Sequence, residues 1–214
     1  MQYQREQHPP GTAINPSDDD GAATSGQTVG LADLRGGYRD VVEDRDRLRA
    51  LYRLDVLDTA PDDVFASLVE IVRRSFGVRV ARIHLLDDTR QWVYAGTDDS
   101  ACTSIPVGQS ACQYAIRQDR TLVIPDLTAD PTICRAVIGG DTMRFYAGTP
   151  LTTRNGHAIG VLCLLDPQAR ATMDPDEVEL LESMAELIVQ TMELRESQVG
   201  ARDDLLRALD DRIP

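Results

Sequence analysis

Residues 143–166, MRFYAGTPLTTRNGHAIGVLCLLD, constrain the fold more than any other stretch of this 214-residue chain. Two apolar segments flank a polar loop that contains Asn155 and Gly156. An Asn-Gly pair between strand-like runs is the strongest short signal for a β-hairpin. The second arm, residues 159–165, has apolar side chains on both faces, interrupted only by Gly160. A strand of that kind is covered on both sides, so the pattern predicts a hairpin whose second strand lies at the centre of a sheet.

Charge and composition exclude several classes of function. The net charge of −13 and a pI near 4.6 disfavour a nucleic-acid or anionic-membrane surface as partner. No run reaches the roughly 18–20 apolar residues of a membrane span, and the N-terminus lacks the apolar core of a signal peptide, so we expect a cytoplasmic protein. The chain contains no lysine, which excludes Schiff-base chemistry and the phosphate-binding lysines of P-loop proteins and kinases.

The cysteines do not form a local metal-binding pattern. The four cysteines are Cys102, Cys112, Cys134 and Cys163. No two of them form a Cys-x-x-Cys pair, and none has a histidine at zinc-finger spacing. From this spacing we expect no metal site and no bound cofactor. In the cytoplasm such thiols stay reduced and are mostly buried.

The chain divides into one domain and two extensions. Residues 1–37 are rich in Pro, Asp, Gly and Ser and poor in large apolar side chains, which is typical of a disordered tail. Residues 38–198 form the predicted domain. Residues 199–214 form a polar helical tail, separated from the last helix of the domain by a break near Gly200.

Three helical patterns frame the domain. Residues 38–57 and 64–76 have apolar side chains at helical spacing, and Gly77 ends the second helix. A long helix follows Asp174, which can cap it, and Pro175 at its first position. This last helix carries two adjacent apolar stripes, wider than one sheet contact requires, so the second stripe is expected to pack on the first helix or on another subunit. The second stripe contains Leu180, Met184, Leu187, Thr191 and Leu194.

The remaining elements are strands, loops and one short helix. Residues 78–87 alternate, with Arg82 and His84 on the face opposite Ala81 and Ile83, so the two polar side chains either line a cavity or face solvent. A strand at 91–95, a short helix at 110–118, a strand at 121–124 and an irregular segment at 127–140 precede the hairpin. Adjacent, hairpin-linked strands predict an α+β fold with an antiparallel sheet and helices on one face.

Five segments together resemble the GAF domain family. They are residues 47–59 (RLRALYRLDVLDT), 87–93 (DDTRQWV), 110–116 (SACQYAI), 122–126 (LVIPD) and 144–166 (RFYAGTPL through GVLCLLD). The resemblance implies a GAF/PAS-like central antiparallel sheet of five to six strands, with the terminal helices on one face and a ligand pocket on the other. It implies a sensory or signalling module that binds a small molecule. In this chain the pocket would draw on Arg82, His84, Trp92, Cys112, Tyr114, Asp126, Arg144 and Tyr146.

Two specialisations of the family do not fit the sequence. Cyclic-nucleotide-binding members carry a lysine-containing signature, which a chain without lysine does not have. Bilin-binding members usually place a Cys-His pair on the short helix, whereas here Cys112 is followed by Gln113.

A third specialisation fits in part. Residues 101–112, ACTSIPVGQSAC, resemble a segment of free methionine-(R)-sulfoxide reductases, which would use Cys134 as nucleophile and Cys102 or Cys112 as resolving thiol. The carboxylates of that family are missing, because the corresponding segments, 145–148 and 161–165, contain no acid.

We therefore interpret the chain as a non-catalytic sensory GAF domain. Family resemblance implies a homodimer through the terminal helices that signals to a downstream protein. The alternatives are a methionine-(R)-sulfoxide reductase and a redox switch through Cys102 and Cys112, which would need Cα atoms within about 7 Å of each other.

Overall fold

The computed structural model describes residues 39–60, 63–98, 103–129 and 143–210, and side chains of the last helix through residue 202. The predicted tail at 1–37, Cys102 and Cys134 lie outside the described residues. Six strands form one sheet in the order β3-β2-β1-β6-β5-β4, and every neighbouring pair is antiparallel. The strands are β1 (Val80–Leu86), β2 (Arg90–Gly96), β3 (Ser104–Pro106), β4 (Leu122–Ile124), β5 (Phe145–Thr152) and β6 (Ala158–Asp166).

The predicted hairpin is confirmed. Strands β5 and β6 join through a turn in which Gly156 has a φ of +82°, a conformation that L-residues rarely adopt. Strand β6 pairs with β5 on one side and with β1 on the other, so it lies at the centre of the sheet. Its two faces enter two different clusters of buried residues, with Leu162 and Leu164 in one and Val161 and Cys163 in the other.

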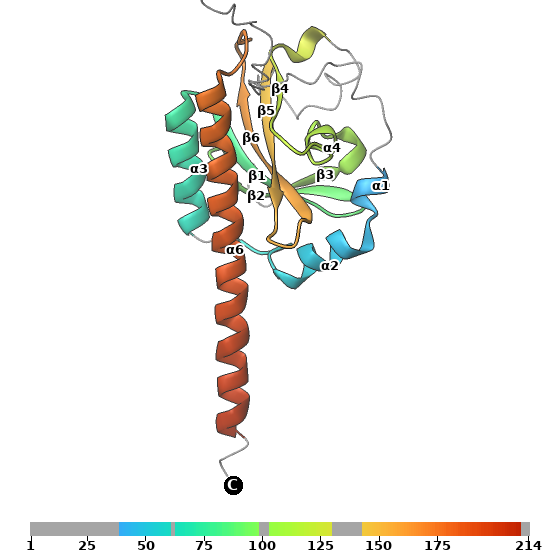
Figure 1. Ribbon diagram of the computed structural model, residues 1–214, viewed down its shortest axis with the longest axis vertical. Helices are drawn as coiled ribbons and strands as arrows, with labels where there is room; N and C mark the ends of the chain where they lie inside the picture. Colours follow the sequence, from blue (N-terminus) through green and yellow to red (C-terminus); the bar gives the residue numbers. More distant parts are fainter. Residues whose placement is uncertain (1–38, 61–62, 99–102, 130–142, 211–214) are drawn as a thin grey trace, which may run out of the picture.

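Long helices cover one face of the sheet. Helix α3 (Asp63–Phe76) packs on β1 and β2, helix α6 (Pro175–Asp210) packs on β5, and the two helices lie side by side (Figure 1). This layer contains the larger core. Gly77, with a φ of +56°, ends α3 as predicted. Asp174 and Glu177 each accept a hydrogen bond from the other's backbone N–H, at 2.8 and 3.0 Å, and so cap α6 as a capping box.

Short elements cover the opposite face. They are α1 (Arg39–Val42), α4 (Cys112–Ala115) and two 3-10 turns, η2 (Val107–Gln109) and η3 (Leu127–Ala129). Helix α4 packs on β5 and β6 (Figure 1). The predicted short helix at 110–118 is therefore present but is one turn long. Within the described residues, no helix combines the length and the apolar character that crossing a membrane requires.

Two predicted helix boundaries are wrong. Residues 38–57 form two helices, α1 and α2 (Arg45–Arg53), because Asp44 adopts an extended conformation and its side chain accepts a hydrogen bond from the N–H of Arg47 at 2.7 Å. Helix α6 has no break at Gly200 and continues to Asp210. An exposed glycine costs a helix only about 1 kcal/mol relative to alanine, so a single one does not end it.

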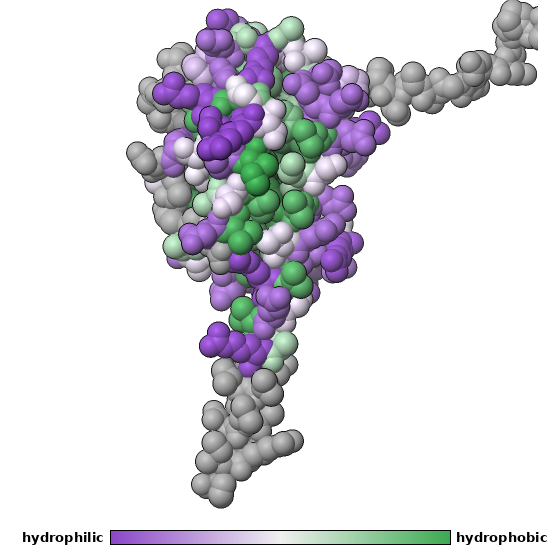
Figure 2. Space-filling view, turned by 90° about the vertical axis from the view of Figure 1, so that its left-hand side faces the viewer, coloured by the Kyte–Doolittle hydropathy of each residue, from purple (hydrophilic) through white to green (hydrophobic). Residues whose placement is uncertain are grey.

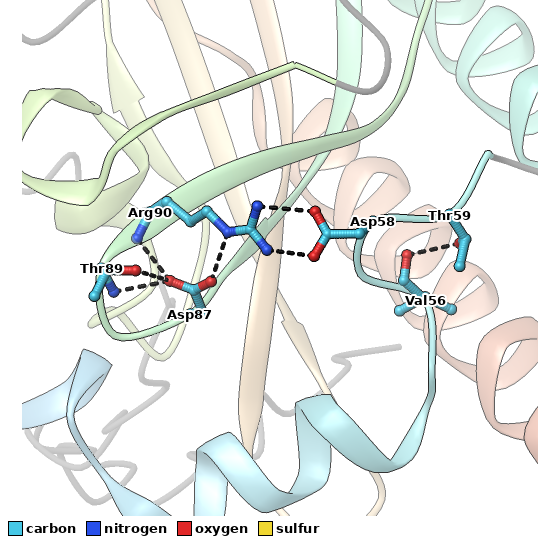
Figure 3. A network of polar contacts seen from close by, with 6 residues as sticks. All are labelled: Val56, Asp58, Thr59, Asp87, Thr89 and Arg90. Atoms are coloured by element: carbon cyan, nitrogen blue, oxygen red, sulfur yellow. Dashed lines mark hydrogen bonds and ion pairs between the residues drawn. The ribbon is translucent and has the colours of Figure 1, made fainter.

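The loop after α2 is fixed to the β1–β2 turn by Arg90 (Figure 3). Its guanidinium donates two hydrogen bonds to Asp58, at 2.8 and 2.6 Å, and one to Asp87 at 2.9 Å. The other carboxylate oxygen of Asp87 accepts hydrogen bonds from the N–H and hydroxyl of Thr89 and from the N–H of Arg90. Two of the segments that resemble the GAF family, 47–59 and 87–93, therefore meet in this network.

Burial alone would raise the pKa of Asp87, but its hydrogen bonds from Thr89 and Arg90 outweigh burial and hold the pKa below its ordinary value. These bonds therefore stabilise the fold above the unfolded-state pKa, and their contribution is lost as pH falls through the folded-state pKa. Asp87→Asn is expected to lower the free energy of unfolding at pH 7 by about 1–2 kcal/mol and to flatten its decline in acid.

Urea denaturation between pH 7 and pH 3 measures both effects of Asp87→Asn. The matched control is Asp88→Asn at the neighbouring, exposed position, where a change below about 0.5 kcal/mol is expected. Equal effects of the two substitutions would contradict the role assigned to Asp87.

Candidate functional site

Four polar side chains meet beneath α4, each from a different element. His84 comes from β1, Cys112 from α4, Tyr146 from β5 and Cys163 from β6. His84 Nδ1 lies 3.0 Å from the sulfur of Cys112 and 3.4 Å from that of Cys163, and the hydroxyl of Tyr146 donates to the Cys112 sulfur at 3.3 Å. All four side chains are buried. We call this group the Cys112 centre.

The Cys112 centre favours one thiolate. Burial alone would raise the pKa of the Cys112 thiol, but hydrogen bonds from Cys163, His84 and Tyr146, with the electrostatic attraction of His84, hold that pKa well below its ordinary value. Burial and hydrogen bonding to Cys112 raise the pKa of Cys163. Burial and the negative charge of Cys112 raise the pKa of Tyr146. Cys112 thus accepts from Cys163 and Tyr146, while the role of His84 Nδ1 depends on the tautomer of its ring.

The sheet register explains why these residues meet. Cys163 on β6 lies directly opposite Arg82 on β1 and Gly148 on β5, so the centre lies where three adjacent strands run side by side. A side chain at Gly148 would collide with the hydroxyl of Tyr146, so this glycine leaves room for the tyrosine ring. The pairing of β1 with β2 shifts register between Ile83 and His84, and such bulges commonly re-aim side chains near functional sites.

A polar chain from the sheet holds α4 over the centre. The hydroxyl of Ser110 donates to the side-chain oxygen of Gln91 on β2, and it accepts a hydrogen bond from the N–H of Cys112 at 2.9 Å. The amide of Gln113 donates to the carbonyl of Gly108 at 3.1 Å. These contacts place the Cys112 sulfur, because they fix the only turn of the helix that carries it.

An ion pair between buried Arg82 and partly exposed Asp98 lies beside the centre. The guanidinium of Arg82 binds both carboxylate oxygens of Asp98, one of them from Nε at 3.2 Å. The Arg82 side chain is 8% exposed, so the interpretation that it faces solvent is wrong. Burial alone would lower the pKa of Arg82, but the hydrogen-bonded pair with Asp98 outweighs burial and raises that pKa, so the guanidinium stays charged next to the thiols.

The structure brings together four of the eight predicted pocket residues, namely Arg82, His84, Cys112 and Tyr146. Tyr114 is half-buried against the cluster on the same face. Trp92 belongs to the core beneath α3 and α6, on the other face of the sheet. Asp126 and Arg144 form an ion pair with each other near the surface, apart from the centre.

Sequence reasoning missed Cys163 as a member of the site. The available signal was strand alternation in β6. Cys163 lies on the same strand face as Val161 and Leu165, opposite the face that carries Leu162 and Leu164. Strand alternation places it on that face, but only the pairing of β6 with β1 places it opposite Arg82. The expectation of no metal site used sequence spacing alone and therefore did not consider this cluster.

A six-stranded antiparallel sheet, covered on one face by long terminal helices and on the other by short segments over a buried polar centre, defines the architecture of a GAF-type module. The chain belongs to the GAF domain family, whose model matches residues 60–192. This agrees with the resemblance found in the sequence.

Comparison with known proteins gives a relative that matches part of this chain. A cyclic di-GMP phosphodiesterase of Pseudomonas aeruginosa is 33% identical over 141 residues, which are 64% of this chain and 24% of that protein. The chain thus matches about a quarter of this relative's length.

Solved structures share the fold at low sequence identity. The GAF domain of an Acinetobacter phosphoenolpyruvate-protein phosphotransferase has a TM-score of 0.57 at 16% identity, covering 71% of this chain and 93% of that one. The free methionine-R-sulfoxide reductase of Neisseria meningitidis, in complex with its substrate, has a TM-score of 0.52 at 20% identity, covering 76% and 91%. The second GAF domain of DevS from Mycobacterium smegmatis has a TM-score of 0.52 at 14% identity, covering 65% and 97%.

Proposed function

We propose that this chain is a sensory module that forms a homodimer through α6 and signals along that helix. The observation that carries the proposal is an exposed apolar strip on α6. Leu187 and Leu194 are 46% and 59% exposed, and Leu180 is 41% exposed. These three leucines lie seven residues apart, which places them on one side of the helix. We call this row the leucine strip.

The leucine strip has the spacing of a coiled-coil seam. Met184 and Thr191 fall between the leucines, so apolar or small side chains recur after four and three residues, as they do in a two-stranded coiled coil. The neighbouring helix α3 adds two exposed apolar residues, Val64 and Ile71, which are also seven apart. Figure 2 shows a hydrophobic patch on the face that carries these helices. Monomers rarely expose a continuous patch of this kind.

The length of α6 favours a second copy of the chain as the occupant of this strip. Its 36 residues correspond to about 54 Å, and its lower part extends away from the sheet (Figure 1). The buried side of α6 runs as far as Met192, whereas Val199 is 59% exposed. A projecting helix with exposed leucines on a continuous seam is stabilised when an identical helix packs along it.

Leu187→Glu is expected to weaken dimerisation at least tenfold, because it places a charge in the middle of the seam and removes apolar area from it. Sedimentation analysis across a concentration series measures the dissociation constant. Val199→Glu is the matched control, because it also replaces an exposed apolar side chain of α6 with a charge, but at a position outside the four-three spacing of the leucine strip. A wild-type chain that stays monomeric at all concentrations would refute the dimer.

The signal in this proposal enters at the face covered by α4. The Cys112 centre and Arg82 are buried polar groups on that face, and β5 carries α4 on one side and α6 on the other. Occupation of that face by a small molecule would therefore act on the strand that supports α6. Native mass spectrometry of the purified protein tests for such a ligand, and a mass equal to that of the bare chain would oppose it.

For this chain we infer a role in regulating another enzyme or signalling protein, on the basis of the relative described above. The Pseudomonas relative is a cyclic di-GMP phosphodiesterase, and this chain matches 24% of it. We carry over a regulatory role for the matched part and no hydrolytic activity.

The reductase and the Cys102–Cys112 switch remain proposals of lower rank. Both need cysteines outside the described residues. In addition, the positions where a reductase of this kind has acids are occupied here by Tyr146, Cys163 and Leu165, which lie in the buried cluster beneath α4. Incubation with free methionine-(R)-sulfoxide and a thiol reductant tests the reductase hypothesis. Turnover would support it, and no turnover by the wild-type chain would reject it. Counting free thiols before and after peroxide treatment, with Cys112→Ser as control, decides the switch.

A further inference from the structure

We propose that Cys112, Cys163 and His84 bind a thiophilic closed-shell metal ion, zinc(II) or copper(I). The two sulfurs and His84 Nδ1 all lie within 4.8 Å of one another, and all three residues are buried. This inference goes beyond the proposed function, because such an ion would bind whether or not α6 dimerises.

The spacing of the three donor atoms fits one ion at their centre. Bond lengths of about 2.3 Å to sulfur and 2.0–2.1 Å to nitrogen place ligand atoms of a tetrahedral or trigonal site roughly 3.4–4 Å apart. In the structure His84 Nδ1 lies 3.0 and 3.4 Å from the two sulfurs. Nδ1 and the Cys112 sulfur would therefore need to separate by about 0.4–1 Å, and Nδ1 and the Cys163 sulfur by at most about 0.6 Å.

The donor set selects the class of ion. Thiolate ligands prefer zinc(II) and copper(I), imidazole suits zinc and copper, and magnesium, calcium and manganese prefer oxygen. The three donors are two sulfurs and one nitrogen. Three protein ligands complete a trigonal copper(I) site and leave one position open on a tetrahedral zinc(II).

Electrostatics favours a cation at this position. Both cysteines bind as thiolates, and any thiol proton still present is released to solvent when the ion enters. Two thiolates neutralise a zinc(II) ion, and Arg82 is already balanced by Asp98, so the loaded site carries little net charge. With copper(I) the remaining single negative charge lies next to the Arg82 guanidinium. An uncompensated charge at such depth would be far more costly.

His84 is oriented as a ligand of such an ion would be. Its Nε2 is buried and has no hydrogen-bond partner within the described part of the chain. Nδ1 faces both sulfurs. The proton of a neutral imidazole can lie on Nε2, which leaves the Nδ1 lone pair directed at the proposed ion.

Tyr146 occupies the position of an outer partner, which is a side chain that hydrogen-bonds to a ligand without binding the ion itself. Its hydroxyl donates to the Cys112 sulfur at 3.3 Å. Outer partners of this kind orient a ligand, and their loss typically costs about 10- to 100-fold in metal affinity. A direct ligand should cost more.

The test uses the full chain, reduced and treated with chelator. It is titrated under anaerobic conditions with zinc(II) and copper(I) in turn, and with cobalt(II) as a spectroscopic probe. We expect one ion per chain and, with cobalt(II), thiolate charge-transfer absorption. Cys112→Ala and Cys163→Ala should each weaken binding by more than about 100-fold, and Tyr146→Phe by about 10-fold. The matched control, Cys102→Ser with Cys134→Ser, should retain wild-type affinity.

A second measurement on the wild-type chain keeps the test valid if a variant unfolds. Bound metal should protect two thiols from alkylation, and peptide mapping should identify them as Cys112 and Cys163. Three outcomes would overturn the proposal: no binding of any of the three ions, protection of Cys102 or Cys134 instead, or affinity unchanged in Cys163→Ala. Loss of dimerisation in Leu187→Glu with metal binding intact would show that the two proposals are separate.

Discussion

Replacing Arg47 with leucine is expected to lower the free energy of unfolding by about 3 kcal/mol. The Arg47 guanidinium is buried and donates to four backbone carbonyls. The distances are 2.9 Å to Val41, 2.7 Å to Leu86, 3.3 Å to Ala158 and 2.6 Å to Val42. Arg47 therefore links α1 and α2 to the ends of β1 and β6.

The cost arises mainly from the carbonyls that would remain. Hydrogen bonds to a charged group contribute about 1.5–3 kcal/mol each, and a buried acceptor left without a donor loses its solvation as well. Leucine replaces the apolar part of the side chain but supplies no donor. Burial also lowers the pKa of Arg47 despite Asp44 nearby, which reflects how far the charge is removed from water.

Arg49→Leu is the matched control on the same helix. The side chain of Arg49 is 72% exposed and pairs with an exposed Asp46, and such surface pairs contribute about 0–1 kcal/mol. Urea denaturation at pH 7 compares the two variants. A loss below about 1 kcal/mol for Arg47→Leu would refute its role as the link between the helices and the sheet.

Gly160→Ala is expected to destabilise the fold by about 3 kcal/mol or more. A side chain at this position would collide with the carbonyl oxygen of His84 and lie 3.2 Å from the Cα of Leu85. The obstacle is backbone rather than a flexible side chain, so β1 and β6 would have to separate where both are central in the sheet. Because His84 moves with that backbone, the Cys112 centre should be disturbed as well.

Gly200→Ala is the opposite case and serves as control. No atom lies within 4 Å of the added methyl group there, and the position is exposed in α6. Alanine is favoured over glycine in a helix by about 1 kcal/mol, so this change should leave stability unchanged or raise it. Thermal denaturation of both variants measures the contrast, and similar melting temperatures for the two would contradict the close packing at Gly160.

Sequence patterns predicted the fold well where local chemistry decides the outcome. The Asn155–Gly156 turn, the stop of α3 at Gly77 and the cap of α6 at Asp174 each depend on residues within one turn of chain. The central place of β6 followed from apolar residues on both of its faces. The patterns were wrong at two positions. At Asp44 a helix cap divides what was predicted as one helix, and at Gly200 the helix continues where a break was predicted.

The candidate site was predicted only in part, because strand alternation shows which face a side chain is on but not which residues of other strands lie beside it. Strand alternation placed Arg82 and His84 on the face away from α3, and the structure confirms that face while burying both residues. Trp92 lies on the opposite face of the sheet. The register shift between β1 and β2 next to His84 is not visible in the apolar pattern of either strand.

The hairpin at residues 143–166 was determined by the sequence itself, because its turn and its doubly apolar strand are properties of consecutive residues. The Cys112 centre was decided by the tertiary structure alone. His84 lies 28 positions before Cys112 and 79 before Cys163, and it contacts both. They meet only because β1 pairs with β6 and Ser110 holds α4 above that pair, and no local pattern encodes such contacts.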